Sequence, residues 1–147
     1  MGTPHFVLGQ EVEVRSIENG FRGSWYPATI FQTPLKLSGP ESNQVEIEYA
    51  SLLDPERASK LLREIALICN LRPKPPDMSN ESFRLGEEVD VYHNDGWWKG
   101  VVTKFLKKEM YTVCLDSTGE EIDFGMLELR SHLGWVDGSW IGADGQV

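Results

Sequence analysis

Hydrophobic and polar residues alternate along several short segments of this chain, the pattern of β-strands with one buried face. Valines alternate with acidic residues at 11–14 and again at 88–91, and apolar residues alternate with glutamates at 45–49. A period of two places one set of side chains toward the core and the other toward solvent. The sequence therefore predicts half-buried strands with outward-facing acids.

The same pattern occurs twice in the chain. Residues 6–14 (FVLGQEVEV) and 83–91 (FRLGEEVDV) share Phe, Leu, Gly, Glu, Val and Val in register. Two further correspondences follow in the same order, namely the aromatic pairs Trp25–Tyr26 and Trp97–Trp98 and the closing motifs Leu71–Arg72 and Leu129–Arg130. An internal repeat of this kind indicates two units of one fold.

A proline-rich connector separates the repeats. Residues 73–82 (PKPPDMSNES) contain three prolines followed by polar residues, which is typical of a stiff linker that becomes flexible. We place the domains at 4–77 and 78–147. Units of this size have small cores, which favours packing of the two against each other.

One segment fits either a helix or a strand. Residues 55–69 carry leucines and isoleucines along one helical face, with proline at the start. Their counterpart in the second repeat, residues 118–124, contains Gly119 and alternates as a strand. Because duplicated units should share a fold, we predict a strand over 60–65 and a tight turn over 66–69.

The predicted fold class is all-β, with two tandem SH3-like barrels of five strands joined by the short linker. Short, strongly bent antiparallel strands close into such a barrel, and side chains fill its interior. We therefore expect binding sites at the barrel rim and no buried catalytic cavity.

Charge narrows the class of partner. The chain has 14 basic and 23 acidic residues, a net charge of -9 and a pI near 4.8. This balance disfavours nucleic acid and favours a cationic segment, although many proteins are acidic for solubility alone. Lys104, Lys107 and Lys108 form a basic cluster too small to anchor a duplex.

Catalytic and metal-binding patterns are missing from the sequence. It has no GxSxG, P-loop or GxGxxG motif, and His5, His93 and His132 are not spaced as metal ligands. Cys69 and Cys114 lie among apolar neighbours without a CxxC motif, which favours a reducing compartment. No apolar run approaches the roughly 18 residues of a membrane span. We expect a soluble monomer that is not an enzyme, has no cofactor and does not bind membranes.

Adjacent aromatic residues are the candidate binding chemistry. Neighbouring strand residues point to opposite faces, so Tyr26 and Trp98 are predicted on the core side, and Trp25 and Trp97 on the other. The outward rings either plug a barrel end, cover the other barrel or line a ligand site. Aromatic rings suit a methylated ammonium because methylation keeps the charge while removing hydrogen-bond donors.

The first unit has the more complete set of such groups. The second unit has Leu115 where the first unit has Tyr49. The predicted methyl-lysine cage consists of Phe21, Trp25, Tyr26, Tyr49 and Asp54.

These motifs resemble the tandem Agenet module, the plant branch of the Tudor-like superfamily. The matching segments lie at 6–14, 20–30, 71–76, 93–102 and 129–140, and cover nearly all of 6–140. Tyr26, Tyr49 and Asp54 are similar in position to cage residues of the Tudor domain in the survival-of-motor-neuron protein. The resemblance implies two packed barrels and a nuclear chromatin reader.

The family further implies a histone partner. The chain is similar to the plant heterochromatin reader that binds histone H3 dimethylated on lysine nine, with the tail lying across both barrels. Since Leu115 departs from the cage pattern, the second unit is expected to supply acidic and aromatic peptide contacts. The predicted contacts are Tyr92, Asp95, Trp97, Trp98, Glu120 and Asp123. An RNA-binding or proline-rich-peptide adaptor is the alternative, and no residue specifies one lysine over another.

Overall fold

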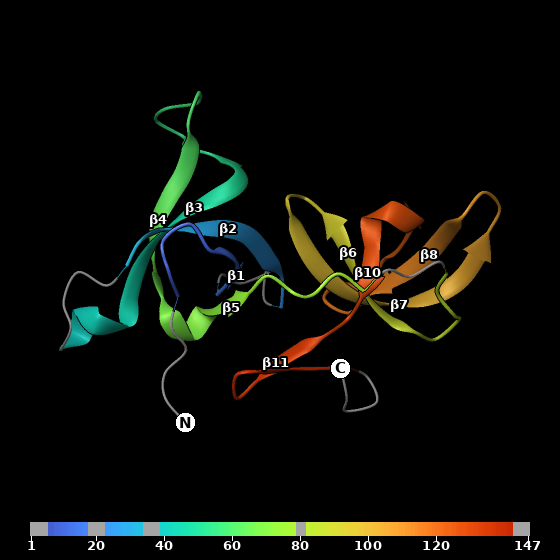
Figure 1. The fold of residues 1–147 in the computed structure, drawn as a ribbon. Coiled ribbons are helices and arrows are strands. Elements are labelled where there is room, and N and C mark those ends of the chain that lie inside the picture. The colour runs from blue at the N-terminus through green and yellow to red at the C-terminus, as the bar shows by residue number, and fades with distance from the viewer. Residues whose placement is uncertain (1–5, 18–22, 34–38, 79–81, 143–147) are drawn as a thin grey trace. The chain divides into compact units, whose positions relative to one another are not determined.

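The computed structural model describes residues 6–17, 23–33, 39–78 and 82–142, and within them the fold is all-β. The described residues contain short 3-10 turns but no α-helix, and therefore no helix long and apolar enough to cross a membrane. The chain divides into two compact units, β1 to β5 and β6 to β12 (Figure 1). The predicted limits of 4–77 and 78–147 stay a prediction.

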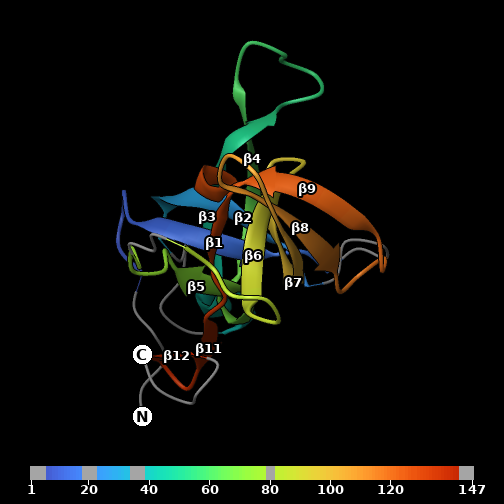
Figure 2. The ribbon, with the colours of Figure 1, turned by 90° about the vertical axis from the view of Figure 1, so that its right-hand side faces the viewer.

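The first unit is a bent antiparallel sheet in the order β5-β1-β2-β3-β4. Its β3–β4 hairpin extends beyond the other strands (Figures 1 and 2). The elements are β1 (Glu11–Arg15), β2 (Trp25–Gln32), η1 (Pro40–Asn43), β3 (Gln44–Leu53), β4 (Leu61–Leu67), η2 (Ile68–Asn70) and β5 (Leu71–Pro73).

The second unit repeats this order as β10-β6-β7-β8-β9. The shared order confirms that the duplicated sequences have one fold. The elements are β6 (Glu88–His93), β7 (Gly96–Leu106), β8 (Met110–Leu115), β9 (Glu121–Gly125), η3 (Met126–Glu128), β10 (Leu129–Ser131), β11 (Gly134–Val136) and β12 (Ser139–Ile141).

The ambiguous segment is a strand, as the repeat predicts. β4 runs two residues further than the predicted 60–65, because Ala66 and Leu67 still pair with Val45 and Gln44 of β3. The turn predicted over 66–69 is instead the 3-10 turn η2 at Ile68–Asn70. The second unit has η3 in the same place, immediately before its closing strand.

Each unit has its own apolar core, built from the inward residues of its strands. The predicted parity of the aromatic pairs is confirmed for Trp98, which is 7% exposed and lies in the core with Val102. The expectation that the acids of β1 and β6 all face solvent is wrong. Glu13 and Asp90 are buried, because each is paired with an arginine from the closing strand of its unit.

An additional hairpin, β11–β12, ends the second unit and was not predicted. Trp135 and Trp140 face each other across it, with ring centroids 4.9 Å apart. Asp137 and Gly138 form its two-residue turn, both at positive φ. Its strands of three residues are too short for a period-two pattern, although Asp-Gly is a strong hairpin signal.

Candidate functional site

Tyr26 and Tyr49 lie on one face of the first unit, at the end of the described β2–β3 pairing. The described pairing of these strands begins with Ala28 opposite Tyr49, and Tyr26 lies two residues before Ala28. Tyr26 therefore shares a face with Tyr49 as its diagonal neighbour, a separation that aromatic side chains can bridge. Both rings are half-buried, so each is anchored in the unit while part of it stays accessible.

Glu64 of β4 adds a carboxylate to these two rings. Its Oε2 accepts a hydrogen bond of 2.9 Å from the Tyr49 hydroxyl. Glu64 lies opposite Ile47, a fully buried residue, so its side chain is on the inward side of the sheet. The signal for Glu64 is a charged residue on the inward side of an edge strand. Sequence reasoning missed it, because the inward side is identified only once the β3–β4 register is known.

An irregularity in β3 sets the position of Tyr49. Glu48 pairs with Arg63 and Leu53 pairs with Leu61, so four residues of β3, 49–52, stand opposite Leu62 alone. A bulge bends its strand and redirects its side chains, and bulges are frequent beside binding sites. The regular pairing of β3 with β4 is therefore interrupted from Tyr49 onward.

Asp54 is engaged in a different place. Its Oδ1 accepts hydrogen bonds from the backbone N–H groups of Glu56 at 2.8 Å and Arg57 at 3.3 Å. It thereby stabilises the turn at the end of the β3–β4 hairpin, beyond the bulge. The carboxylate in contact with Tyr49 is Glu64 rather than Asp54.

Trp25 belongs to a cluster on the opposite face of the sheet from Tyr26. The Arg72 guanidinium lies 4.0 Å from the centroid of the Trp25 ring. Arg72 also donates to Glu13 Oε1 from Nε at 3.0 Å and from Nη2 at 2.8 Å. Trp25 is therefore stacked on an internal cation. Phe21, the remaining predicted cage residue, lies outside the described residues.

The second unit contains the same cluster. Arg130 lies 4.0 Å from the centroid of the Trp97 ring, and its Nε is 3.1 Å from Asp90 Oδ2. Asp90 has a further partner in His132, whose Nδ1 is 2.8 Å from Oδ1. Tyr92 contacts Trp97 edge-on at 5.1 Å. Tyr92 and Trp97 are brought together, but one face of Trp97 is covered by the arginine of its own unit.

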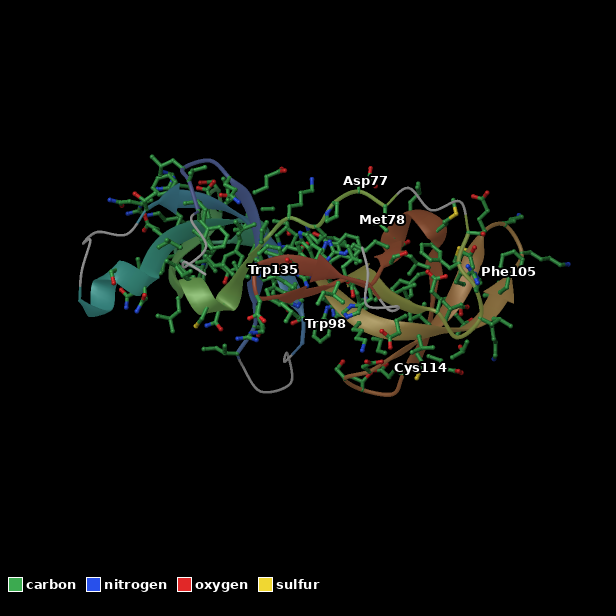
Figure 3. The ribbon with its side chains drawn as sticks, turned by 60° about the horizontal axis from the view of Figure 1, so that its bottom comes forward. Asp77, Met78, Trp98, Phe105, Cys114 and Trp135 are labelled. Atoms are coloured by element: carbon green, nitrogen blue, oxygen red, sulfur yellow. The ribbon has the colours of Figure 1, made fainter. Side chains whose placement is uncertain are left out.

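The two units differ at the positions of the tyrosine pair. Gly100 pairs with Leu115 as Ala28 pairs with Tyr49, so Trp98 and Leu115 occupy the places of Tyr26 and Tyr49. Both are buried, and Trp98 donates from Nε1 to the carbonyl of His93 at 2.7 Å (Figure 3). These positions are core in the second unit and partly accessible in the first.

The three predicted acids of the second unit lie on separate elements. Asp95 is in the two-residue β6–β7 turn, at φ 67°. Glu120 lies in the β8–β9 loop, where its N–H donates to Thr118 Oγ1. Asp123 is on β9 and accepts a 2.6 Å hydrogen bond from Thr112. Within the described residues, no cluster of three or more His, Cys, Asp or Glu fits a metal ion.

Comparison with known proteins gives concordant matches over both units. The Agenet domain model matches residues 9–76 and 86–142. The Arabidopsis thaliana protein AGENET DOMAIN (AGD)-CONTAINING P1 is 40% identical over 136 residues, which is 90% of this chain and 26% of that protein. The chain thus spans about a quarter of this curated relative.

Two solved structures share the fold. The crystal structure of AGD34 of Arabidopsis thaliana AGDP1 has a TM-score of 0.81 and 32% identity, covering 92% of this chain and 88% of that one. The crystal structure of ADCP1 tandem Agenet domain 3-4 has a TM-score of 0.77 and 30% identity, covering 92% and 86%.

Proposed function

Because this chain belongs to the Agenet domain family, we propose that it reads a methylated lysine, with Tyr26, Tyr49 and Glu64 of the first unit holding the methylammonium. Agenet domains are often chromatin readers and are typically not enzymes. The ligand we propose is a histone H3 tail dimethylated on lysine nine. Under this proposal the protein acts in the nucleus.

The observation that carries the proposal is the partly accessible tyrosine pair beside a carboxylate. The ring faces would attract a methylated cation, which gives up little hydration when it leaves water. Glu64 contributes negative charge and an acceptor for the remaining N–H of a dimethylated nitrogen. Since Trp98 and Leu115 are buried at the same positions, we assign the methyl-lysine to the first unit alone.

Tyr49→Leu tests the tyrosine pair directly. Leucine is the residue that the second unit has at this position, so it preserves apolar packing while removing the ring face. We expect the affinity for a dimethylated H3 peptide to fall about 2- to 30-fold, as for losing one cation–π contact, with little change for the unmodified peptide. Isothermal titration calorimetry with both peptides measures this.

The matched control is Phe105→Ala, which removes an exposed ring of β7 in the second unit (Figure 3). It should leave both affinities unchanged. Equal affinity of the unaltered protein for the two peptides would overturn the proposal, and full discrimination in Tyr49→Leu would exclude this site.

Glu64→Gln tests the degree of methylation. A dimethylammonium has one N–H to donate, whereas a trimethylammonium has none, so the carboxylate should favour the dimethylated form. In the variant we expect binding of both forms to weaken and the preference for dimethyl over trimethyl to shrink. Calorimetry with the two peptides decides it, since an unaltered preference would remove Glu64 from the site.

A further inference from the structure

β4 (Leu61–Leu67) is an edge strand of the first unit. Among the strands that the structure describes, its partner is β3, with Gln44 opposite Leu67 and Glu48 opposite Arg63. An edge strand presents a row of backbone N–H and C=O groups to which a further strand can bond. Glu64 of the proposed lysine site lies in the middle of this strand, so the site borders the edge.

The edge exposes large apolar side chains, which its counterpart in the second unit does not. Among the described strands, β9 is also an edge strand, and it exposes Glu121 and Asp123, of which Asp123 is hydrogen-bonded to Thr112. Such charges discourage pairing with another chain. β4 exposes the charged Arg63 and Glu64 as well, but also the apolar Ile65 and Leu67, at 56% and 44%. The two edges therefore differ in their exposed apolar side chains.

The two charged residues of β4 are already committed to neighbouring strands. Arg63 donates to Glu48 at 2.9 Å, and its guanidinium lies 3.7 Å from the centroid of the Phe31 ring. Glu64 accepts from Tyr49. Neither side chain is therefore directed along the edge as a free charge that would repel an incoming strand.

We infer that a basic, extended peptide pairs with β4 as an added strand, with its methylated lysine opposite Glu64; this inference rests on the proposed function. Directly paired residues on neighbouring strands point to one face, about 4.5 to 5.5 Å apart at Cβ. A lysine opposite Glu64 would thus be directed toward Tyr49. Residues on either side of the lysine would then pack on the outer face with Ile65.

Charge favours a cationic peptide over a second copy of this chain as the occupant. Glu46 is opposite Ile65 on the outer face, where Arg63 is paired with Glu48, and Glu64 is on the inner face, so these four charged residues carry a net negative charge. Two copies of a chain with net charge -9 repel each other, whereas a lysine-rich tail is attracted.

A backbone methylation scan tests the added strand. In strand pairing, alternate peptide N–H groups point to the partner, so N-methylation should weaken binding only at every second position. Around a dimethyl-lysine in an H3 peptide, we expect about a 2- to 13-fold loss per bonded amide and little change at the amides between. A flat scan with methyl discrimination retained overturns strand addition and leaves the proposed function standing.

Ile65→Lys provides the second measurement, because it places a charge on the open edge. We expect at least a threefold loss of affinity for the dimethylated peptide. Leu127→Lys, which adds the same charge at a residue 94% exposed on η3, should not change it. Equal losses in the two variants would indicate net charge alone and contradict the inference.

The remaining outcomes separate the two proposals. An alternating N-methylation pattern with equal affinity for methylated and unmodified peptides would support the added strand and overturn the lysine site. Concentration-dependent dimerisation that Ile65→Lys abolishes, measured by sedimentation, would assign the edge to a second copy and overturn the inference.

Discussion

Replacing Arg72 with alanine is expected to destabilise the first unit by about 3 to 5 kcal/mol, the usual effect of removing one member of a buried ion pair. Arg72 and Glu13 are each 2% exposed, and both donors of the pair converge on Glu13 Oε1. Truncation leaves the Glu13 carboxylate buried without its arginine and uncovers the Trp25 ring. Urea titration followed by NMR, which reports on each unit separately, measures the loss.

The second unit provides the matched control. Arg130→Ala should destabilise it less, since the Arg130 side chain is 20% exposed and Asp90 keeps His132 at 2.8 Å. Replacing both members of the first pair, as in Glu13→Leu with Arg72→Met, should recover most of the stability, because no charge is then left buried. If Arg72→Ala and Arg130→Ala lower the free energy of unfolding of their units equally, the burial of the first pair does not contribute to stability.

Repetition was the part of the sequence that predicted the fold. Residues 55–69 taken alone fit a helix, and the strand was predicted because the second repeat carries Gly119 in a segment that alternates. The structure has β4 there. Because the two repeats share one fold, the repeat with the less ambiguous pattern determines the prediction for the other.

The residues of the site were harder to predict from the sequence than the strands were. Alternation assigns Glu13 to the solvent side, yet the residue is buried because Arg72 comes from 59 positions away. Asp54 was predicted because its position is similar to that of a polar cage residue of the Tudor domain, and Glu64 was not among the predicted residues. Which carboxylate meets Tyr49 depends on the pairing of β3 with β4 and on the bulge at 49–52, and neither has a local signature.

Gly100 shows where the repeat misleads, and its replacement by alanine is the second large effect that we expect. Ala28 is the equivalent residue of the first unit, so the duplication suggests that alanine would be tolerated. A Cβ on Gly100 would instead lie 2.5 Å from Val113 Cγ1 and 2.7 Å from the Cys114 carbonyl oxygen. We expect Gly100→Ala to destabilise the second unit by about 1 to 3 kcal/mol, as overpacking does.

Gly125→Ala in β9 separates this contact from the general effect of replacing a strand glycine. Its Cβ would meet only Glu128 Oε1 and Met110 Sδ, both at 3.7 Å, which is ordinary van der Waals contact. It should stay within about 0.5 kcal/mol of the unaltered protein, the range for substitutions away from such features, in the same urea titration. If Gly100→Ala changes the stability as little, β8 can move away from β7 to accommodate the added Cβ. The core packing of the two units is then more alike than the contacts of Gly100 imply. If it is destabilising, the two copies have diverged in core packing as well as at the rim. Alanine then fits opposite Tyr49 in the first unit but not opposite Leu115 in the second.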